Sequence, residues 1–231
     1  MKKTALLLGL SLLSSTAIAN TYNAQVDVDY LKIDNFDVIG VEGSYYVDHV
    51  TTKNTAWAEA AFMGKNNSVS VGYLDLNGDA YTLNLGGDYY HNNIFVGLDV
   101  AYTDPDYGSS DTTLSAELGY FFAKDWLVSI SGADEDFSDS LELSTKYIAT
   151  LADGQFINVE ASYLNLDSDF TASADYYWTA KSSVGLDLST EEGYNFGVNA
   201  QHFFTPAIAA RVSYISLDND DAFAIGVTGR F

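Results

Sequence analysis

The sequence predicts an all-β protein, an antiparallel transmembrane β-barrel of about fourteen strands with short turns at one rim and short acidic loops at the other. Three observations lead to this prediction. The chain opens with an export signal, its segments alternate apolar and polar residues, and pairs of aromatic residues stand where strands end. The 17 Tyr, 13 Phe and 3 Trp suit the belts of rings found at membrane–water interfaces.

The N-terminus has the three parts of a secretory signal peptide. Met1-Lys2-Lys3 is positively charged, residues 5–13 form a short apolar run, and Ala17-Ile18-Ala19 matches a cleavage site. We therefore expect a signal peptide over 1–19 and a single outer-membrane barrel domain over 20–231. No later segment approaches the roughly 18 consecutive apolar residues of a membrane helix.

Aromatic pairs followed by a short polar segment recur along the chain. Because such rings prefer the membrane interface, we expect the pairs to form one girdle, beside turns that face the periplasm together with both termini. A soluble β-sandwich with aromatic corners is the alternative. The pairs are Tyr45-Tyr46, Tyr89-Tyr90, Phe121-Phe122, Tyr176-Tyr177 and Phe203-Phe204, and a weaker copy ends at Tyr147.

Segments of about ten residues alternate in the first half of the chain, and each is interpreted as a strand. Val96 and Leu98, for example, oppose Gly97 and Asp99. An apolar face turned toward lipid and a polar face turned toward a lumen explain this alternation. The expected strands are 22–31, 36–46, 55–76, 79–90, 94–104, 111–122 and 125–134.

The third of these segments is interrupted by Gly64-Lys65-Asn66-Asn67. The alternation changes phase across this stretch, so we expect a β-bulge that leaves 55–76 as one strand. A turn at the same place would split the segment and move Tyr89-Tyr90 to the opposite rim.

The second half of the chain alternates in the same way. Ile157 and Val159 oppose Asn158 and Glu160. The expected strands are 139–149, 154–166, 169–177, 181–189, 193–204, 207–217 and 221–231. An even count is usual for bacterial barrels, and twelve or sixteen strands remain possible.

The last segment is amphipathic to its end. Phe223, Ile225 and Val227 share one face with the terminal Phe231. A closing strand that ends in Phe resembles the signal read by the barrel-assembly machinery of Gram-negative bacteria. That resemblance implies the machinery as a partner and the outer membrane, with its lipid and lipopolysaccharide, as the location.

Charge and composition exclude several functions. The chain has 32 acidic and 10 basic residues and no Cys. Nucleic acid is an unlikely partner for such a surface, and disulfides cannot staple the fold. Excess acid favours cations near the surface and in the lumen.

The acidic outer loops could bind Ca²⁺ or Mg²⁺, or be merely solvated. No cluster has the spacing of a calcium-binding loop, so we expect no metal site. The loop acids are Asp104, Asp106, Asp111, Asp134, Glu135, Asp136, Asp139, Asp167, Asp169, Glu191, Glu192, Asp218, Asp220 and Asp221.

A barrel of this size is wider than the roughly eight strands whose side chains fill the interior. No segment looks long enough to be a plug, so we expect an open, water-filled lumen. Rings of carboxylates attract cations, which predicts a cation-preferring path, although the same residues could line a lumen without any constriction. The predicted pore-lining residues are Asp27, Asp29, Glu42, Asp99, Glu117, Glu142, Lys146, Glu160, Asp187, Arg211 and Arg230.

Catalysis is not expected. The histidines are His49, His91 and His202, and none stands in a pattern with Ser and an orienting acid. The pair Glu191-Glu192 lacks a partner pattern for glycoside chemistry. We expect no catalytic residues and no cofactor.

The N-terminal half resembles the putative general bacterial porin family. The resemblance rests on Tyr45-Tyr46, on Trp57-Ala58-Glu59-Ala60-Ala61-Phe62 and on Ser68-Val69-Ser70-Val71, and the closing Phe231 agrees with it. It implies an outer-membrane barrel for passive diffusion of small hydrophilic solutes or ions. The short outer loops depart from the large trimeric porins, so neither their inward-folded loop nor their trimer is implied.

Two functions therefore stand against each other. The first is a porin, with a preference for cations. The second is a non-conducting barrel with a structural or surface-binding role. A channel for one apolar solute would need an apolar lumen patch or an N-terminal plug, and the sequence indicates neither.

Overall fold

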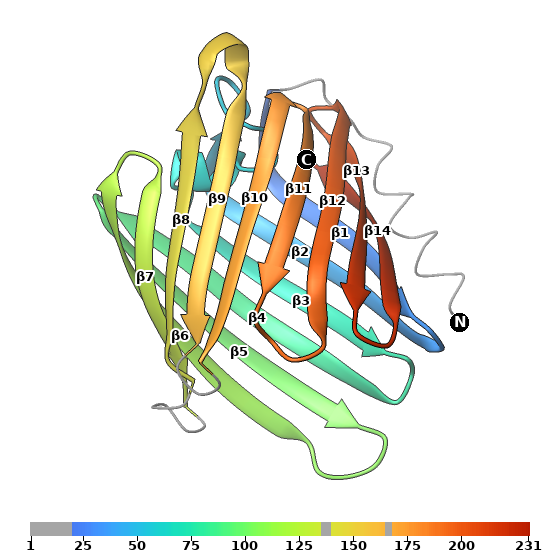
Figure 1. The fold of residues 1–231 in the computed structure, drawn as a ribbon. Helices are drawn as coiled ribbons and strands as arrows, with labels where there is room; N and C mark the ends of the chain where they lie inside the picture. Colours follow the sequence, from blue (N-terminus) through green and yellow to red (C-terminus); the bar gives the residue numbers. More distant parts are fainter. Residues whose placement is uncertain (1–19, 135–139, 165–167) are drawn as a thin grey trace.

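The protein forms a closed antiparallel β-barrel of fourteen strands in a computed structural model that describes residues 20–134, 140–164 and 168–231 (Figure 1). Each strand pairs with its neighbours in sequence, and β1 pairs with β14 to close the barrel. The predicted fold class and strand number are confirmed. None of the helices in the described part of the chain is long and apolar enough to cross a membrane.

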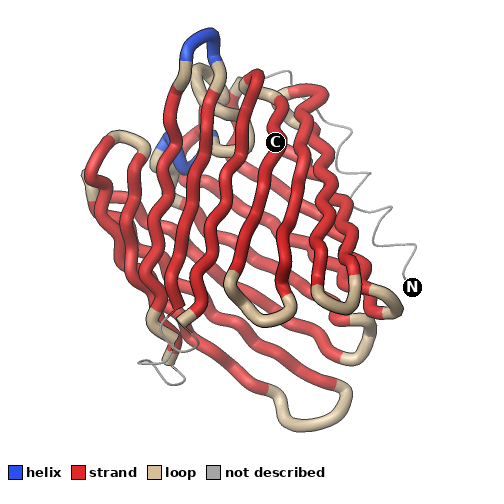
Figure 2. The backbone as a smooth tube through the Cα atoms, in the orientation of Figure 1, coloured by secondary structure: helices blue, strands red, loops and turns tan. Residues whose placement is uncertain are grey.

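The strands follow the predicted order with shifted ends. They are β1 (Thr21–Ile33), β2 (Phe36–Thr51), β3 (Ser68–Leu76), β4 (Ala80–His91), β5 (Ile94–Pro105), β6 (Asp111–Ala123), β7 (Trp126–Ala133), β8 (Glu142–Thr150), β9 (Phe156–Leu164), β10 (Asp169–Thr179), β11 (Ser182–Ser189), β12 (Tyr194–Thr205), β13 (Ile208–Leu217) and β14 (Asp221–Arg230). Two short helices, α2 (Ala60–Gly64) and η1 (Ala152–Gly154), lie at one end of the barrel (Figure 2).

The two faces of each strand differ as the alternation predicts. On β5, Ile94 and Leu98 are exposed on the outer surface, whereas Phe95 between them is buried. Side chains of successive strand residues point to opposite faces, so a period of two separates a lipid-facing surface from a polar interior. The long exposed apolar residues of the other strands complete this outer surface.

The barrel has two unlike rims. The turn rim holds the start of β1, the C-terminus and the tight turns that follow β4, β6, β10 and β12, and the loop rim holds the opposite connections (Figure 1). At the turn rim, Asn92 joins β4 to β5 in a left-handed conformation, with φ of 54°. At the loop rim, Asn77-Gly78 joins β3 to β4 with φ of 59° and 78°, a geometry suited to two-residue hairpins.

The prediction of one strand over 55–76 is wrong. β3 begins only at Ser68, and residues 52–67, which we call the plug segment, leave the barrel wall after β2. The plug segment contains α2, which ends at Lys65 in a left-handed conformation with φ of 51°. A helix end therefore replaces the expected β-bulge, and the barrel keeps its even count.

Some sequence-based expectations lie outside the described residues. These are the signal peptide 1–19, one end of the strands expected at 139–149 and 154–166, and the loop acids Glu135, Asp136, Asp139 and Asp167.

Candidate functional site: the lumen and its plug

The plug segment packs into the barrel at the turn rim. Ala56 and Ala60 are fully buried, and Met63 is nearly so. Ala56 and Met63 lie in one apolar cluster with Ile148 of β8 and Tyr177 of β10. Small and flexible apolar side chains let this connection approach the inner wall closely. The plug segment therefore has a core of its own inside the barrel.

Each aromatic pair contributes one ring to the membrane surface and one to the interior. Phe122 is 64% exposed, whereas its neighbour Phe121 is 1% exposed. The inner rings form a collar around the plug segment, and Phe121 lies 5.6 Å from Phe62 between ring centroids. The pairs were expected to form only an outer girdle. The inner collar rings are Tyr46, Tyr90, Phe121, Tyr177 and Phe203.

A charge network, which we call the plug clamp, fixes the plug segment to the opposite wall. The Lys146 ammonium lies 2.9 Å from Glu59 Oε2 of the plug segment and 2.8 Å from Glu160 Oε1 of β9. Tyr177 donates a hydrogen bond to Glu59 Oε1 at 3.0 Å. The side chains of Glu59 and Lys146 are 13% and 25% exposed, so removal of either partner leaves a poorly solvated charge.

Backbone and cation–π contacts hold the two ends of the plug segment. The Trp57 amide donates to the Ala180 carbonyl at 2.8 Å, and the Trp57 ring lies 5.8 Å from Phe203. At the other end, the Lys65 ammonium stands 3.8 Å from the centroid of Phe121. The segment is thereby attached to strands on several sides of the barrel.

A buried carboxyl lies close to this end of the plug segment. Asp125, in the turn between β6 and β7, is buried, and its Oδ2 lies 3.8 Å from the exposed Lys124 ammonium. Burial raises the pKa of the Asp125 carboxyl above its usual range, and the ammonium groups of Lys124 and Lys65 only partly oppose this effect.

The expectation of an open lumen without a plug is therefore wrong at the turn rim. Residues 57–62 are apolar apart from Glu59, and so short a segment fits a strand or a buried helix equally well by pattern alone. The sequence has no long segment outside the expected strands, so it did not suggest a plug. The plug segment uses only the residues between β2 and β3.

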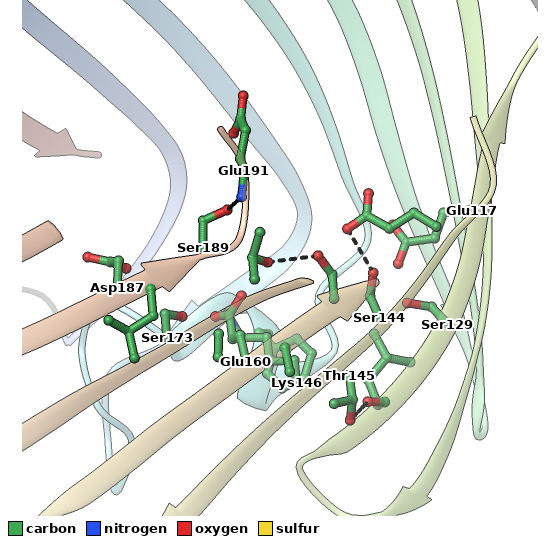
Figure 3. Close-up of a pocket in the computed structure, with 18 of the residues that line it drawn as sticks. Glu117, Ser129, Ser144, Thr145, Lys146, Glu160, Ser173, Asp187, Ser189 and Glu191 are labelled. Atoms are coloured by element: carbon green, nitrogen blue, oxygen red, sulfur yellow. Dashed lines mark hydrogen bonds and ion pairs between the residues drawn. The ribbon is translucent and has the colours of Figure 1, made fainter. Parts of the chain in front are cut away.

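Above the plug segment, toward the loop rim, the lumen widens into a cavity of about 560 Å³ (Figure 3). Phe62 of the plug segment lines it together with the inward rings of Tyr90 and Phe95 and with Leu127. Glu191, just before β12, and Tyr194, at its start, line the other end of the cavity. The cavity thus has apolar side chains at one end and polar ones at the other.

The wall of this cavity is ordered in rows that the strand register defines. One row, which we call the hydroxyl row, crosses five strands, and a second row on its turn-rim side carries the plug clamp. A third row on its loop-rim side places Glu117 and Glu142 on either side of Ser131. The hydroxyl row is Ser129, Ser144, Ser162, Thr171 and Ser189, and the second row is Lys146, Glu160, Ser173 and Asp187.

Most of the cavity carboxylates have no cation of their own. Glu142 accepts a hydrogen bond from Ser144 at 3.3 Å, and Asp187 accepts one from Asn199 at 3.3 Å. Figure 3 shows Glu117 and Asp187 on opposite sides of the cavity. Among the residues that the structure describes, Glu117, Glu142 and Asp187 form no ion pair.

A second charge network lies on the inner wall where the barrel closes. We call it the seam staple. Arg211 of β13 donates to Asp29 Oδ1 through Nε at 2.8 Å and to Asp27 Oδ1 through Nη1 at 2.8 Å. Thr228 of β14 accepts a further hydrogen bond from Nη1 at 2.8 Å. The guanidinium therefore crosses β14 and joins β13 to β1.

The seam staple passes directly over Gly226. A Cβ atom added there would lie 2.5 Å from Arg211 Nε and still closer to Asp29 Oδ1. Only glycine leaves room for the guanidinium to cross the strand.

The remaining predicted pore-lining residues are dispersed. Glu42 lines a second cavity of about 310 Å³ together with Asp29. Asp99 lies beside Gly86, where an added Cβ would meet its Oδ2 at 2.9 Å. Arg230 is 4% exposed and stacks between Tyr22 and Phe203, at 4.4 and 4.5 Å from the ring centroids.

Three interior carboxylates were not predicted. Asp88 accepts a hydrogen bond from Ser68, Asp175 accepts one from Asn158, and Glu59 belongs to the plug clamp. Asp88 and Asp175 stand two residues before the inner rings Tyr90 and Tyr177, so the repeated Asp-Tyr-Tyr phrase contains the signal that places them inside. Within the described ranges, no group of three or more His, Cys, Asp or Glu residues could hold a metal ion.

Comparison with known proteins identifies relatives of this barrel. A family model described as putative general bacterial porin matches residues 1–138 and 130–231. The crystal structure of the Acinetobacter baumannii outer membrane protein Omp33 is similar, with a TM-score of 0.81 and 22% identity over 92% of this chain and 99% of that chain.

Other solved barrels are more distant. A triple mutant of the Rhodopseudomonas blastica porin has a TM-score of 0.48 and 10% identity, over 90% of this chain and 99% of that chain. The KdgM porin in complex with disordered oligogalacturonate has a TM-score of 0.48 and 8% identity over the same shares. No curated protein matches the sequence.

Proposed function

The chain belongs to the putative general bacterial porin family and is an outer-membrane porin, and we propose that it prefers cations and that the plug segment controls its conductance. The preference follows from the cavity wall. Glu117, Glu142 and Asp187 have no ion-pair partner among the described residues, and the ammonium of Lys146 is already shared by two carboxylates. This excess of unpaired carboxylate is the observation that carries the proposal.

The proposed control of conductance follows from the position of the plug segment. The plug segment occupies the lumen at the turn rim, and we infer from the short turns after β4, β6, β10 and β12 that this rim faces the periplasm. A solute that enters from the loop rim reaches the cavity first and the plug segment second. Conductance then depends on how often the plug clamp releases.

A non-conducting barrel with a structural or surface-binding role is the second candidate. The observation that favours it is the same plug segment, because its contacts with the collar rings and with Lys146 fill the turn rim. If the plug segment never leaves, the cavity is a pocket and no ion crosses.

Two further partners belong to this proposal. The C-terminal Phe231 continues the closing seam, since its carbonyl accepts hydrogen bonds from the amides of Asn23 and Ala24 at 2.8 and 3.1 Å. We infer that the barrel-assembly machinery recognises this strand end. The acidic loop rim would meet lipopolysaccharide through bridging divalent cations.

The test is single-channel conductance and reversal potential of the refolded protein in a planar bilayer under a salt gradient. We expect a reversal potential on the cation side, reduced in the double variant Glu117→Gln with Asp187→Asn. The matched control, Asp79→Asn with Asp218→Asn, removes the same charge from the loop rim. No conductance from correctly folded barrels would favour the non-conducting candidate, and a reversal potential near zero would refute the cation preference.

A further inference from the structure

The cavity above the plug segment has the size of a ligand site. Its volume of about 560 Å³ lies within the range of small-molecule pockets, roughly 300–1,000 Å³. Phe62 of the plug segment lines its turn-rim end, so a solute entering from the loop rim meets the plug segment there. Such a solute contacts the wall before it can move on.

The charge of the cavity calls for a cationic ligand with separated charges. Glu117 and Glu142 pair with the same residue, Ser131, from opposite sides, so their backbones stand two strand spacings apart, or about 10 Å. Glu160 and Asp187 flank Ser173 in the same way. No described trio of acidic or imidazole groups could hold a metal ion, because the carboxylates are spread along the wall.

The other residues that line the cavity indicate which chemical group would join the two charges of the ligand. Phe62, Phe95 and Leu127 give the cavity an apolar floor, which suits a hydrocarbon spacer. The hydroxyl row runs between the row of Glu160 and Asp187 and the row of Glu117 and Glu142, which we call the acidic rows. Within the hydroxyl row, Ser162 and Thr171 hydrogen-bond each other at 2.8 Å. Hydroxyls can accept hydrogen bonds from ammonium groups that lie between carboxylates.

We propose that this cavity binds elongated organic dications, in which an apolar spacer joins two ammonium groups. The spacer lies over the apolar floor, and the ammonium groups meet carboxylates of the acidic rows. The inference rests on the proposed function, because it names the class of solute that the path would admit and retain. It adds a binding preference that a merely acidic lumen would not have.

The experiment measures binding and conductance on the same folded protein. The probes are 1,5-diaminopentane and pentylamine, which share a spacer and differ in one charge. Isothermal titration calorimetry of the barrel in detergent micelles gives affinity whether or not the protein conducts. We expect the diamine to bind at least about tenfold more tightly than the monoamine, which is about 1.4 kcal/mol.

Two variants locate the site. Glu117→Gln with Glu142→Gln should reduce diamine affinity about tenfold, about 1.4 kcal/mol, and leave pentylamine less affected. Asp79→Asn with Asp218→Asn, at the loop rim, should leave both affinities unchanged. Heat-modifiable migration on gels verifies that each variant is folded.

The outcomes separate this inference from the proposed function. Diamine binding without conductance would support the site and refute the channel. Conductance with equal, weak binding of both amines would support the channel and overturn the site. Diamine binding that the cavity variant does not weaken would also overturn it, since the ligand would then lie elsewhere.

Discussion

The plug clamp and the seam staple have the same composition, one cation between two carboxylates, but they join different parts of the molecule. Lys146 joins the wall to the plug segment through Glu59, whereas Arg211 joins one wall strand to another through Asp27 and Asp29. The first contact can open without loss of a single strand hydrogen bond. The second closes the barrel itself, so its loss falls on folding stability.

The cations suit these tasks. Arg211 uses Nε and Nη1 to bind two carboxylates and a hydroxyl at fixed angles. Lys146 presents a compact ammonium on a flexible stem, which can be withdrawn more readily. A charge that faces the lumen of a barrel therefore does not by itself identify the permeation path.

Replacement of Lys146 by Met should have the largest effect, because it removes the cation of the plug clamp. Loss of the ammonium leaves Glu59 and Glu160 unpaired, which weakens plug docking by about 3 kcal/mol. The ratio of docked to released plug then falls roughly a hundredfold. Single-channel recordings should show larger or longer openings.

The matched control for that variant is Lys32→Met. Lys32 forms an exposed ion pair with Asp37 at 3.2 Å near the loop rim, and exposed ion pairs contribute little to the stability of a fold. Its conductance should remain close to that of the original protein. Unchanged openings in Lys146→Met would show that the clamp does not hold the plug segment.

Replacement of Arg211 by Met tests the other network. Asp27 and Asp29 then lie side by side on the inner face of β1 without a cation, and the free energy of unfolding should fall by about 2 kcal/mol. Urea titration followed by Trp fluorescence measures this change. Adding Asp27→Asn and Asp29→Asn should restore part of the loss, and channel openings should keep their duration. A longer opening in Arg211→Met would contradict the division of roles.

A smaller effect is expected from Gly226→Ala, which disturbs the seam staple without removing any of its charges. The new Cβ would meet Arg211 and Asp29, so the guanidinium must shift, with a loss of about 1 kcal/mol in unfolding free energy. Gly43→Ala is the control, because nothing lies within 4 Å of its added Cβ. Equal urea midpoints for the two variants would argue against the staple.

The smallest effect should come from Asp125→Asn. Unlike the variants of the seam staple, it should raise the free energy of unfolding. The pKa of the Asp125 carboxyl is raised in the folded protein by burial, so the folded state holds the proton more tightly than the unfolded state. Stability is therefore greatest below the unfolded pKa, near 3.9, and is lost as pH rises through the folded pKa.

The asparagine side chain does not ionise, so the variant does not lose stability as the pH rises. At pH 7, Asp125→Asn should shift the urea midpoint slightly upward, and at pH 3 the two proteins should coincide. A lower midpoint at pH 7 would mean that the contact with Lys124 outweighs the cost of burial.

The sequence was sufficient for the features that depend on period two. The alternation around Glu117, Glu160 and Asp187 placed these side chains on the inner face, where they line the cavity. The fourteen strands follow from the same pattern together with the repeated aromatic pairs. Both signals are local, so each strand carries its own.

The plug segment and the seam staple could not be predicted in this way. The run at 57–62 fits either a strand or a helix, and its partners lie on distant strands. Arg211 and Asp27 are 184 residues apart in sequence and meet only because β1 pairs with β14. Such contacts need the register and closure of the whole barrel.

The place of the plug segment in the chain has a consequence for folding order. It follows β2, yet it rests on Phe121, Lys146, Tyr177 and Phe203, and its hydrogen bond from Tyr177 to Glu59 spans 118 residues. Contacts of such long sequence separation form late, after loop-closure entropy has been overcome. The plug segment can therefore be fully seated only once β12, which carries Phe203, is in place, and until then Trp57 lacks its aromatic partner.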